Sequence, residues 1–183
     1  MSKLRFQSSM VLATMLSFVL MLAVNEWLFK GLEFAPGINW IYLPAGMRLL
    51  STLLFGEAGA VGLLLVSWLL CFCFFFPGDI GRSFMGGILA TAAPYLAYRI
   101  AQRAYGLHAS LATLSPRRLL VCVVGYSLAS PLLHHIWFAL RGDTHDLVQG
   151  FVVMAVGDLS GTLIVIYTMK MLLSAFPNAG RTR

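Results

Sequence analysis

The chain has 183 residues, of which 59% are hydrophobic and only 11% are charged, and its formal net charge is +6. Soluble domains are typically about 45–50% apolar and roughly 25% charged. This composition excludes a soluble globular enzyme, a disordered protein and a nucleic-acid-binding module, and it predicts an integral membrane protein. The positive charge fits the excess of Lys and Arg in cytoplasmic loops of membrane proteins, so we expect no nucleic-acid partner.

Six apolar runs follow one another along the chain, separated by short segments that contain Gly, Pro and charged residues. A membrane-spanning helix needs about 20 mostly apolar residues, and the alternation typical of barrel strands is missing. The sequence therefore predicts one domain over residues 1–183, an all-α polytopic bundle of about six transmembrane helices, the first of them retained rather than cleaved as a signal peptide. The runs cover residues 9–29, 38–55, 58–76, 83–101, 119–140 and 147–169.

The distribution of basic residues predicts the orientation. With the N-terminus inside, nine of the 13 Lys and Arg residues face the cytoplasm, three (Lys30, Arg82 and Arg141) face outward, and Arg48 lies within a run. Cytoplasmic loops carry the excess of Lys and Arg. We therefore expect both termini in the cytoplasm and a multi-pass protein of the bacterial inner membrane, in contact with the lipid bilayer.

The second run leaves two alternatives open. Pro44 suits the first turn of a helix, where its missing N–H costs nothing. A helix that begins there would keep only about a dozen helical residues before Gly56, with residues 38–43 extended, and would form a half-span. Otherwise a continuous helix would be kinked at Pro44.

Three ionisable residues lie inside the predicted spans, where each costs about 2.5–3.5 kcal/mol to insert. They are Glu26, Arg48 and Asp158, and by the predicted topology all lie in the outer half of the membrane or near its midplane. We expect a polar cavity open to the outside, with Arg48 as its cationic centre and a small ligand as its occupant. The candidate ligand-binding residues are Arg48, Asp158, Glu26, Trp40, Tyr42 and His134. The alternative is a structural pair between Arg48 and Asp158 or Glu26.

Small residues and a proline are expected to serve helix packing rather than binding. Gly157 and Gly161 form a G-x-x-x-G pair, which lets a neighbouring helix approach closely. Pro44 and Gly46 belong to the same packing class at the start of the second span.

No metal, cofactor or enzymatic activity is expected. His134 and His135 are adjacent, so on a helix their side chains point about 100° apart, although Asp143, His145 and Asp146 follow in the next loop. The three cysteines lie in apolar runs without zinc or disulfide spacing. Hydrolase, P-loop and haem-attachment motifs are absent from the sequence.

Two short motifs resemble those of the MASE-type integral membrane sensor domains. Trp40-Ile41-Tyr42-Leu43-Pro44-Ala45-Gly46 resembles the family's W-P-P-A-G opening, with Tyr42-Leu43 in place of the first of the paired prolines, and Gly157-Asp158 resembles its late Gly-Asp motif. The resemblance implies a sensor fold that binds a small ligand. That family usually has about eight spans and a C-terminal output domain, so a relative with six spans would signal to a separate partner protein.

A second resemblance concerns architecture alone. Six spans in about 180 residues are similar to the substrate-binding subunits of energy-coupling-factor vitamin transporters. Those subunits contact a partner protein through small residues of the first span, a role that Ala13 and Ser17 would have in this chain. A transport subunit is therefore the alternative function. A purely structural subunit of a membrane complex, or a homo-oligomer, is a further alternative.

Overall fold

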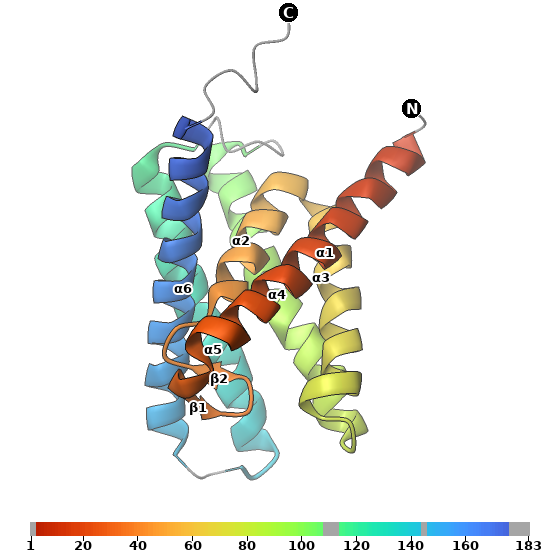
Figure 1. Cartoon of the computed structure of the whole chain (residues 1–183), viewed down its shortest axis with the longest axis vertical. Helices are drawn as coiled ribbons and strands as arrows, with labels where there is room; N and C mark the ends of the chain where they lie inside the picture. Colours follow the sequence, from red (N-terminus) through yellow and green to blue (C-terminus); the bar gives the residue numbers. More distant parts are fainter. Residues whose placement is uncertain (1–2, 108–113, 144–145, 176–183) are drawn as a thin grey trace, which may run out of the picture.

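The computed structural model describes residues 3–107, 114–143 and 146–175, and these ranges are predominantly helical (Figure 1). The predicted helical class is confirmed, with the addition of a small two-stranded hairpin. The helices are α1 (Lys3–Phe29), α2 (Leu43–Phe55), α3 (Glu57–Leu70), α4 (Ile80–Tyr105), α5 (Pro116–Leu140) and α6 (Leu147–Ala175), and a π-helical turn (Cys71–Phe75) extends α3.

Four helical segments in the described ranges are long and apolar enough to cross a membrane. They are Leu4–Leu32, Glu57–Phe75, Pro116–Leu140 and Leu147–Leu172. The predicted second and fourth spans differ from this pattern: α2 has only 13 residues, and α4 has 26 residues but carries Arg82, Arg99 and Arg103. The apolar runs thus located the helices, and by length and composition four of the described helical segments are suited to cross a membrane.

The second apolar run is not one helix. Its first residues belong to a hairpin in which β1 (Glu33–Ala35) pairs antiparallel with β2 (Ile38–Asn39). Gly37, at φ +80°, makes the turn between them in a conformation that favours glycine. Helix α2 then begins at Leu43, with Pro44 in its first turn. The short-helix alternative is therefore the one observed.

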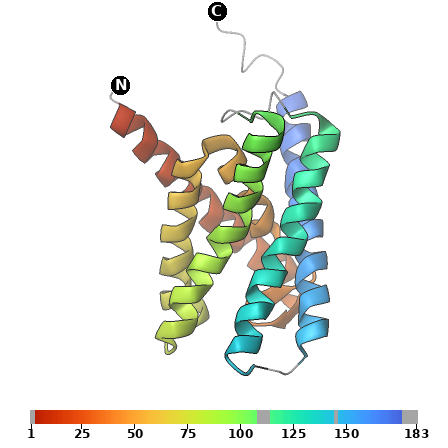
Figure 2. The same cartoon turned by 180° about the vertical axis from the view of Figure 1, so that it is seen from behind.

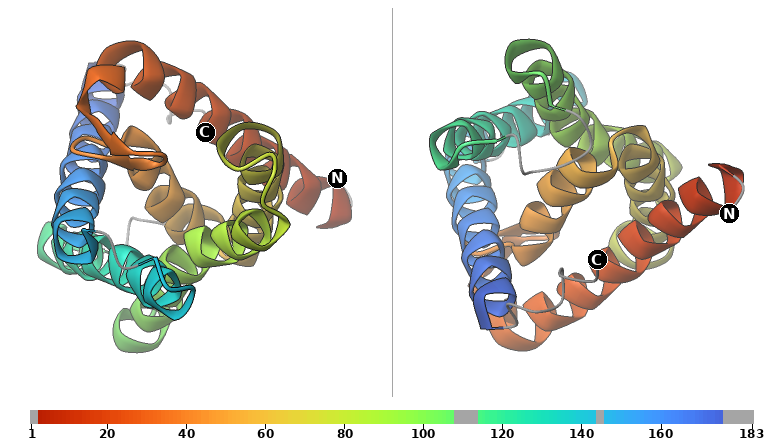
Figure 3. Two further views of the ribbon diagram at one scale, coloured as in Figure 1. Left: turned by 90° about the horizontal axis from the view of Figure 1, so that it is seen from below. Right: turned by 90° about the horizontal axis from the view of Figure 1, so that it is seen from above.

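The short helix α2 lies inside a ring made by the other five helices, as the two end-on views in Figure 3 show. It packs against α1, α3, α4 and α6. Ten of its 13 residues are buried. A 13-residue helix is about 20 Å long, shorter than the roughly 30 Å hydrocarbon core of a bilayer. The ring therefore encloses space beyond the N-terminus of α2 that no helix fills.

Antiparallel helix pairs form the wall of the ring, with α3 beside α4 and α5 beside α6 (Figure 2). The outward face of the wall is apolar. Helix α5, for example, exposes the stripe Val121, Val124, Leu128, Leu132 and Ile136. Large contiguous apolar surfaces are rare on soluble monomers, so this face is suited to lipid.

Candidate functional site

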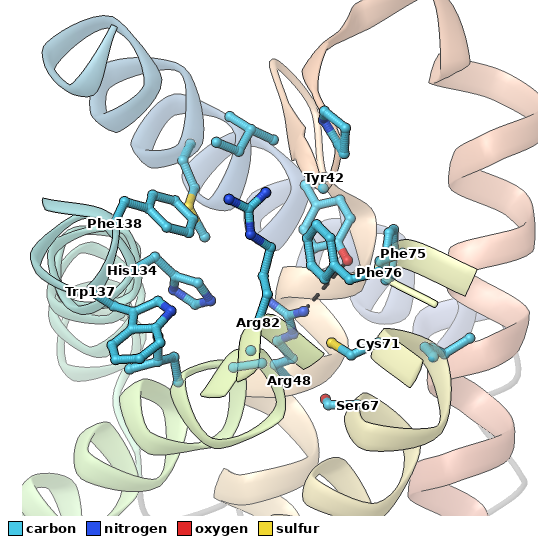
Figure 4. A pocket seen from close by; sticks show the side chains of 18 of the residues that line it. Tyr42, Arg48, Ser67, Cys71, Phe75, Phe76, Arg82, His134, Trp137 and Phe138 are labelled. Atoms are coloured by element: carbon cyan, nitrogen blue, oxygen red, sulfur yellow. Dashed lines mark hydrogen bonds between the residues drawn. The ribbon is translucent and has the colours of Figure 1, made fainter. Parts of the chain in front are cut away.

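A cavity of about 70 Å³ occupies the space beyond the N-terminus of α2 (Figure 4). All six helices and the hairpin contribute residues to its lining. Figure 4 shows His134, Trp137 and Phe138 of α5 on one side and Tyr42, Cys71 and the aromatic residues after α3 on the other, with two arginines between them. The cavity exists because α2 begins halfway along the ring.

Arg48 is the cationic group on the α2 side of this cavity, and it is only 8% exposed. Its guanidinium lies over the rings of Phe18 and Tyr42, at 5.4 and 5.2 Å from their centroids. Its Nη2 donates a long hydrogen bond of 3.5 Å to the Tyr42 hydroxyl. Cation–π contacts compensate part of the lost hydration of a buried arginine, but no partner for Arg48 Nε is found among the described residues.

Three further polar groups of the lining have unpartnered atoms within the described ranges: Ser67 Oγ, Arg82 Nε and Trp137 Nε1. The indole and guanidinium nitrogens can only donate hydrogen bonds. His134 adds a different group, because its Nδ1 lies 2.8 Å from the Ser130 carbonyl oxygen and must donate to it. The lining therefore offers donors from Arg48, Arg82 and Trp137, whereas the other ring nitrogen of a neutral His134 can accept. The charge of Arg48 has no ion-pair partner among the described residues, while Arg82 pairs with Asp79 and Asp143.

A wider vestibule of about 220 Å³ adjoins the cavity on the side of the hairpin and the α5–α6 connection. The two spaces share the lining residues Pro36, Ile38, Phe76, Arg82 and Phe138. These residues form the neck between the cavity and the vestibule.

Arg82 at this neck belongs to a network of charged side chains that we call the latch, made of Asp79, Arg82, Arg141 and Asp143. Arg82 Nη2 donates to Asp143 Oδ2 at 2.7 Å, and Arg141 Nη2 lies 3.1 Å from Asp79 Oδ2. The hydrogen bond from Arg141, together with the one from the Arg82 N–H, holds the pKa of Asp79 below its usual value. The latch joins the start of α4 to the segment after α5.

The structure brings together three of the six predicted ligand-binding residues: Tyr42, Arg48 and His134 line the cavity. Trp40 is 41% exposed, and Glu26 is half-buried in α1. Neither lines the cavity or the vestibule.

Asp158 is separate from the cavity lining, although it is only 1% exposed. It interacts electrostatically with Arg48. Among the ion pairs of the described residues, however, none joins Arg48 to Asp158 or to Glu26. The structural pair considered from the sequence is thus not in contact.

The predicted packing residues fix the chain where it enters α2. The Gly157 carbonyl accepts a hydrogen bond of 3.1 Å from the Tyr42 N–H. A Cβ built at Gly157 would collide with the Asn39 carbonyl oxygen, and one at Gly161 with the Tyr42 carbonyl oxygen. The small residues of α6 thus allow close approach of the segment before α2 at Gly157 and of the start of helix α2 itself at Gly161. Gly46, further along α2, packs against Val165 and Thr162 of α6.

Sequence reasoning missed Asn25, which is fully buried in α1. Its Oδ1 accepts a hydrogen bond of 2.9 Å from the N–H of Leu43, the first residue of α2. An amide in an otherwise apolar span was the available signal, since buried polar groups need partners. Ser67, Arg82 and Trp137 were also missed as lining residues.

The two adjacent histidines have different surroundings. His135 is buried, holds the Pro131 carbonyl oxygen at 2.8 Å and packs edge-on against Phe138 and Phe151. No three His, Cys, Asp or Glu side chains come together for a metal within the ranges that the structure describes. His145 lies outside those ranges.

Comparisons with models of protein families, with curated proteins and with solved structures found no match. The family resemblance noted in the sequence therefore rests on its motifs alone. In space, these motifs meet, because Gly157 contacts the segment between β2 and α2.

Proposed function

We propose that this protein is a six-segment protein of the bacterial inner membrane with both termini in the cytoplasm, and that it binds a small anionic ligand around Arg48. The vestibule and the latch then face the periplasm, so the ligand enters from outside. The orientation rests on the distribution of Lys and Arg. Four long apolar helices and the lipid-suited outer face support a membrane location.

We infer the chemical class of the ligand from the hydrogen-bond donors in the cavity lining that have no acceptor. Arg48 Nε and Trp137 Nε1 each lack a hydrogen-bond acceptor within the described part of the chain. Arg82 Nε also forms no hydrogen bond there, but it lies 3.8 Å from Asp79 Oδ2 in an ion pair. Buried donors without acceptors are costly, by about 1–3 kcal/mol each. A carboxylate supplies acceptors and negative charge together, and it matches the planar fork of an arginine.

The size of the cavity narrows the ligand further. An engineered cavity of about 150 Å³ accommodates benzene. The volume of about 70 Å³ beside Arg48 therefore suits a carboxylate head group. The remainder of a small organic acid would pass the neck into the vestibule, along the aromatic side chains of Phe76 and Phe138.

We propose a sensor role in which α2 transmits the binding event. Arg48 lies in the second turn of α2, and this helix touches four others. A ligand that draws Arg48 toward the cavity shifts α2 against α1, α3, α4 and α6, and a separate signalling protein would read that shift. The MASE-like motifs favour this role over the alternatives of a transporter subunit or a structural subunit, and over an enzyme.

Ligand binding is tested with the purified full-length protein in detergent. Thermal unfolding is followed with the choline salts of acetate, benzoate and succinate, and we expect at least one of them to stabilise the wild type. Arg48→Gln should remain folded and lose this stabilisation. Arg99→Gln is the matched control, because Arg99 pairs with the exposed Glu57 away from the cavity. Equal stabilisation of Arg48→Gln and the wild type would contradict the proposed site.

The sensor role is tested by purification of the protein from mild detergent. Co-purification of a histidine kinase or a cyclase would support it. An ATPase-bearing complex in their place would favour the transporter subunit.

A further inference from the structure

A second polar cluster lies outside the cavity, between α5 and α6. Its five side chains are each at most 2% exposed. Six of their oxygen atoms form no hydrogen bond of good geometry within the described chain, although the Ser130 hydroxyl faces Asp158 and the Tyr126 hydroxyl faces Arg48. We call it the Asp158 cluster, and its members are Tyr126, Ser127, Ser130, Asp158 and Thr162. Both carboxylate oxygens of Asp158 are among the six.

The antiparallel register of α5 and α6 places these residues at matching levels of the two helices. His135 lies against Gly150, and the Asp158 carboxylate faces the Ser130 hydroxyl. One turn from Ser130 toward the start of α5 lies Ser127. One turn from Asp158 in the same direction, toward the end of α6, lies Thr162. Tyr126 interacts electrostatically with Asp158.

The hydroxyl groups of this cluster behave differently from others in the bundle. Thr14, Ser17 and Thr91 each donate to the carbonyl oxygen four residues earlier, at 2.7–2.9 Å. This is the usual solution for a hydroxyl inside a helix. Ser127, Ser130 and Thr162 make no such bond.

Backbone oxygen adds to the cluster. Pro131 has no N–H, so the Ser127 carbonyl lacks the donor that an α-helix normally provides four residues later. Oxygen atoms from a carboxylate, hydroxyl groups and a carbonyl are the ligands that hard cations prefer.

The cluster carries a single negative charge, which one monovalent cation would balance. Asp158 is its only carboxylate, and an isolated carboxylate inside a membrane is costly. Arg48 interacts with it electrostatically without forming an ion pair of 4 Å or less. A divalent ion would leave excess positive charge beside this arginine.

We propose that the Asp158 cluster binds a sodium ion between α5 and α6. The ion would be held by Asp158, by the hydroxyl groups of Ser127, Ser130 and Thr162, and by the Ser127 carbonyl. The residues of this site do not line the anion cavity, and the proposal does not rest on the nature of the cavity ligand.

Binding is measured with the purified full-length protein in a choline-based buffer, by scintillation proximity with ²²Na⁺ and by thermal unfolding. We expect saturable binding of ²²Na⁺ and stabilisation by NaCl, neither of which KCl or choline chloride reproduces at the same ionic strength. Absence of saturable ²²Na⁺ binding to the wild type would overturn the proposal. So would stabilisation by mild acid without ²²Na⁺ binding, because a proton would then neutralise Asp158.

Matched hydroxyl variants locate the ion. Thr162→Val should weaken sodium binding by at least about tenfold, since even the loss of an outer-shell partner has an effect of that size in metal sites. Thr91→Val removes a hydroxyl that already has an intrahelical partner, and it should leave sodium binding unchanged. Equal affinities of the two variants would contradict the site. Asp158→Asn should abolish binding; if that variant does not fold, Ser127→Ala takes its place, with the same expected weakening as Thr162→Val.

Discussion

Arg82 and Asp143 join the first turn of α4 to the segment that follows α5 through a contact of 2.7 Å, although 61 positions separate them in the sequence. Arg82 also lines both the cavity and the vestibule. A residue that lines the neck therefore also ties two connections together. We expect access to the cavity to depend on the integrity of the latch.

Breaking the latch should expose the cavity. Arg82→Gln removes the pair with Asp143, and exposed ion pairs are worth about 0.2–1 kcal/mol, which corresponds to a rate increase of up to roughly fivefold. The measurement is the reaction of Cys71, which lines the cavity, with a membrane-impermeant thiol reagent in a Cys73→Ser, Cys122→Ser background. Arg103→Gln, at the other end of α4, is the control. A rate that does not change in Arg82→Gln would show that the latch does not limit access.

The latch should also respond to acid. The pKa of Asp79 is lowered in the folded protein, because Arg141 and the Arg82 N–H bind its charged form. A lowered folded-state pKa gives stability that is present above the unfolded-state pKa and lost as the pH falls through the folded-state pKa. We expect the thermal stability that Asp79 adds, wild type minus Asp79→Asn, to be constant above pH ~5, to begin to fall near pH ~4, and to vanish only below the lowered folded-state pKa. The same acid response in both proteins would contradict this role of Asp79.

The sequence predicted the helices of the bundle better than the residues of the candidate site. Long apolar runs located the helices because the length and hydrophobic periodicity of a run are properties of the local sequence. The position of Pro44 allowed the short helix that creates the cavity, and the ionisable residues pointed to Arg48. The hairpin was missed because its strands have only two or three residues, too few for an alternating pattern.

Side-chain convergence was predicted only in part, because it depends on how each helix is rotated about its axis. His134 turns toward the cavity, whereas His135 turns toward α6. The sequence predicts only that Arg82 is a charged residue facing outward. The packing of α4 against α5 makes it part of the neck. Asp158 shares the depth of Arg48 but faces α5 instead of the cavity.

The orientation in the membrane has a direct test. Alkaline phosphatase fused after Arg141 should be active, because the latch end of the bundle faces the periplasm in the proposed topology. A fusion after Gly106, at the end of α4, should be inactive, since that end faces the cytoplasm. Activity is compared after normalisation to the amount of fusion protein. An inactive Arg141 fusion with an active Gly106 fusion would reverse the orientation, and equal activities would show that α5 does not cross.

The close approach of extended backbone to α6 should make Gly157 sensitive to the smallest substitution. In Gly157→Ala the new methyl group collides with the Asn39 carbonyl oxygen, which is backbone and cannot rotate away. Overpacking of this kind costs about 1–3 kcal/mol. Gly125→Ala in α5 is the matched control, because a Cβ there meets no atom within 4 Å, and alanine stabilises a helix by roughly 0.5–1 kcal/mol relative to glycine. Thermal unfolding in detergent should therefore move in opposite directions for the two variants. A Gly157→Ala protein as stable as the Gly125→Ala protein would show that the segment before α2 does not rest on α6.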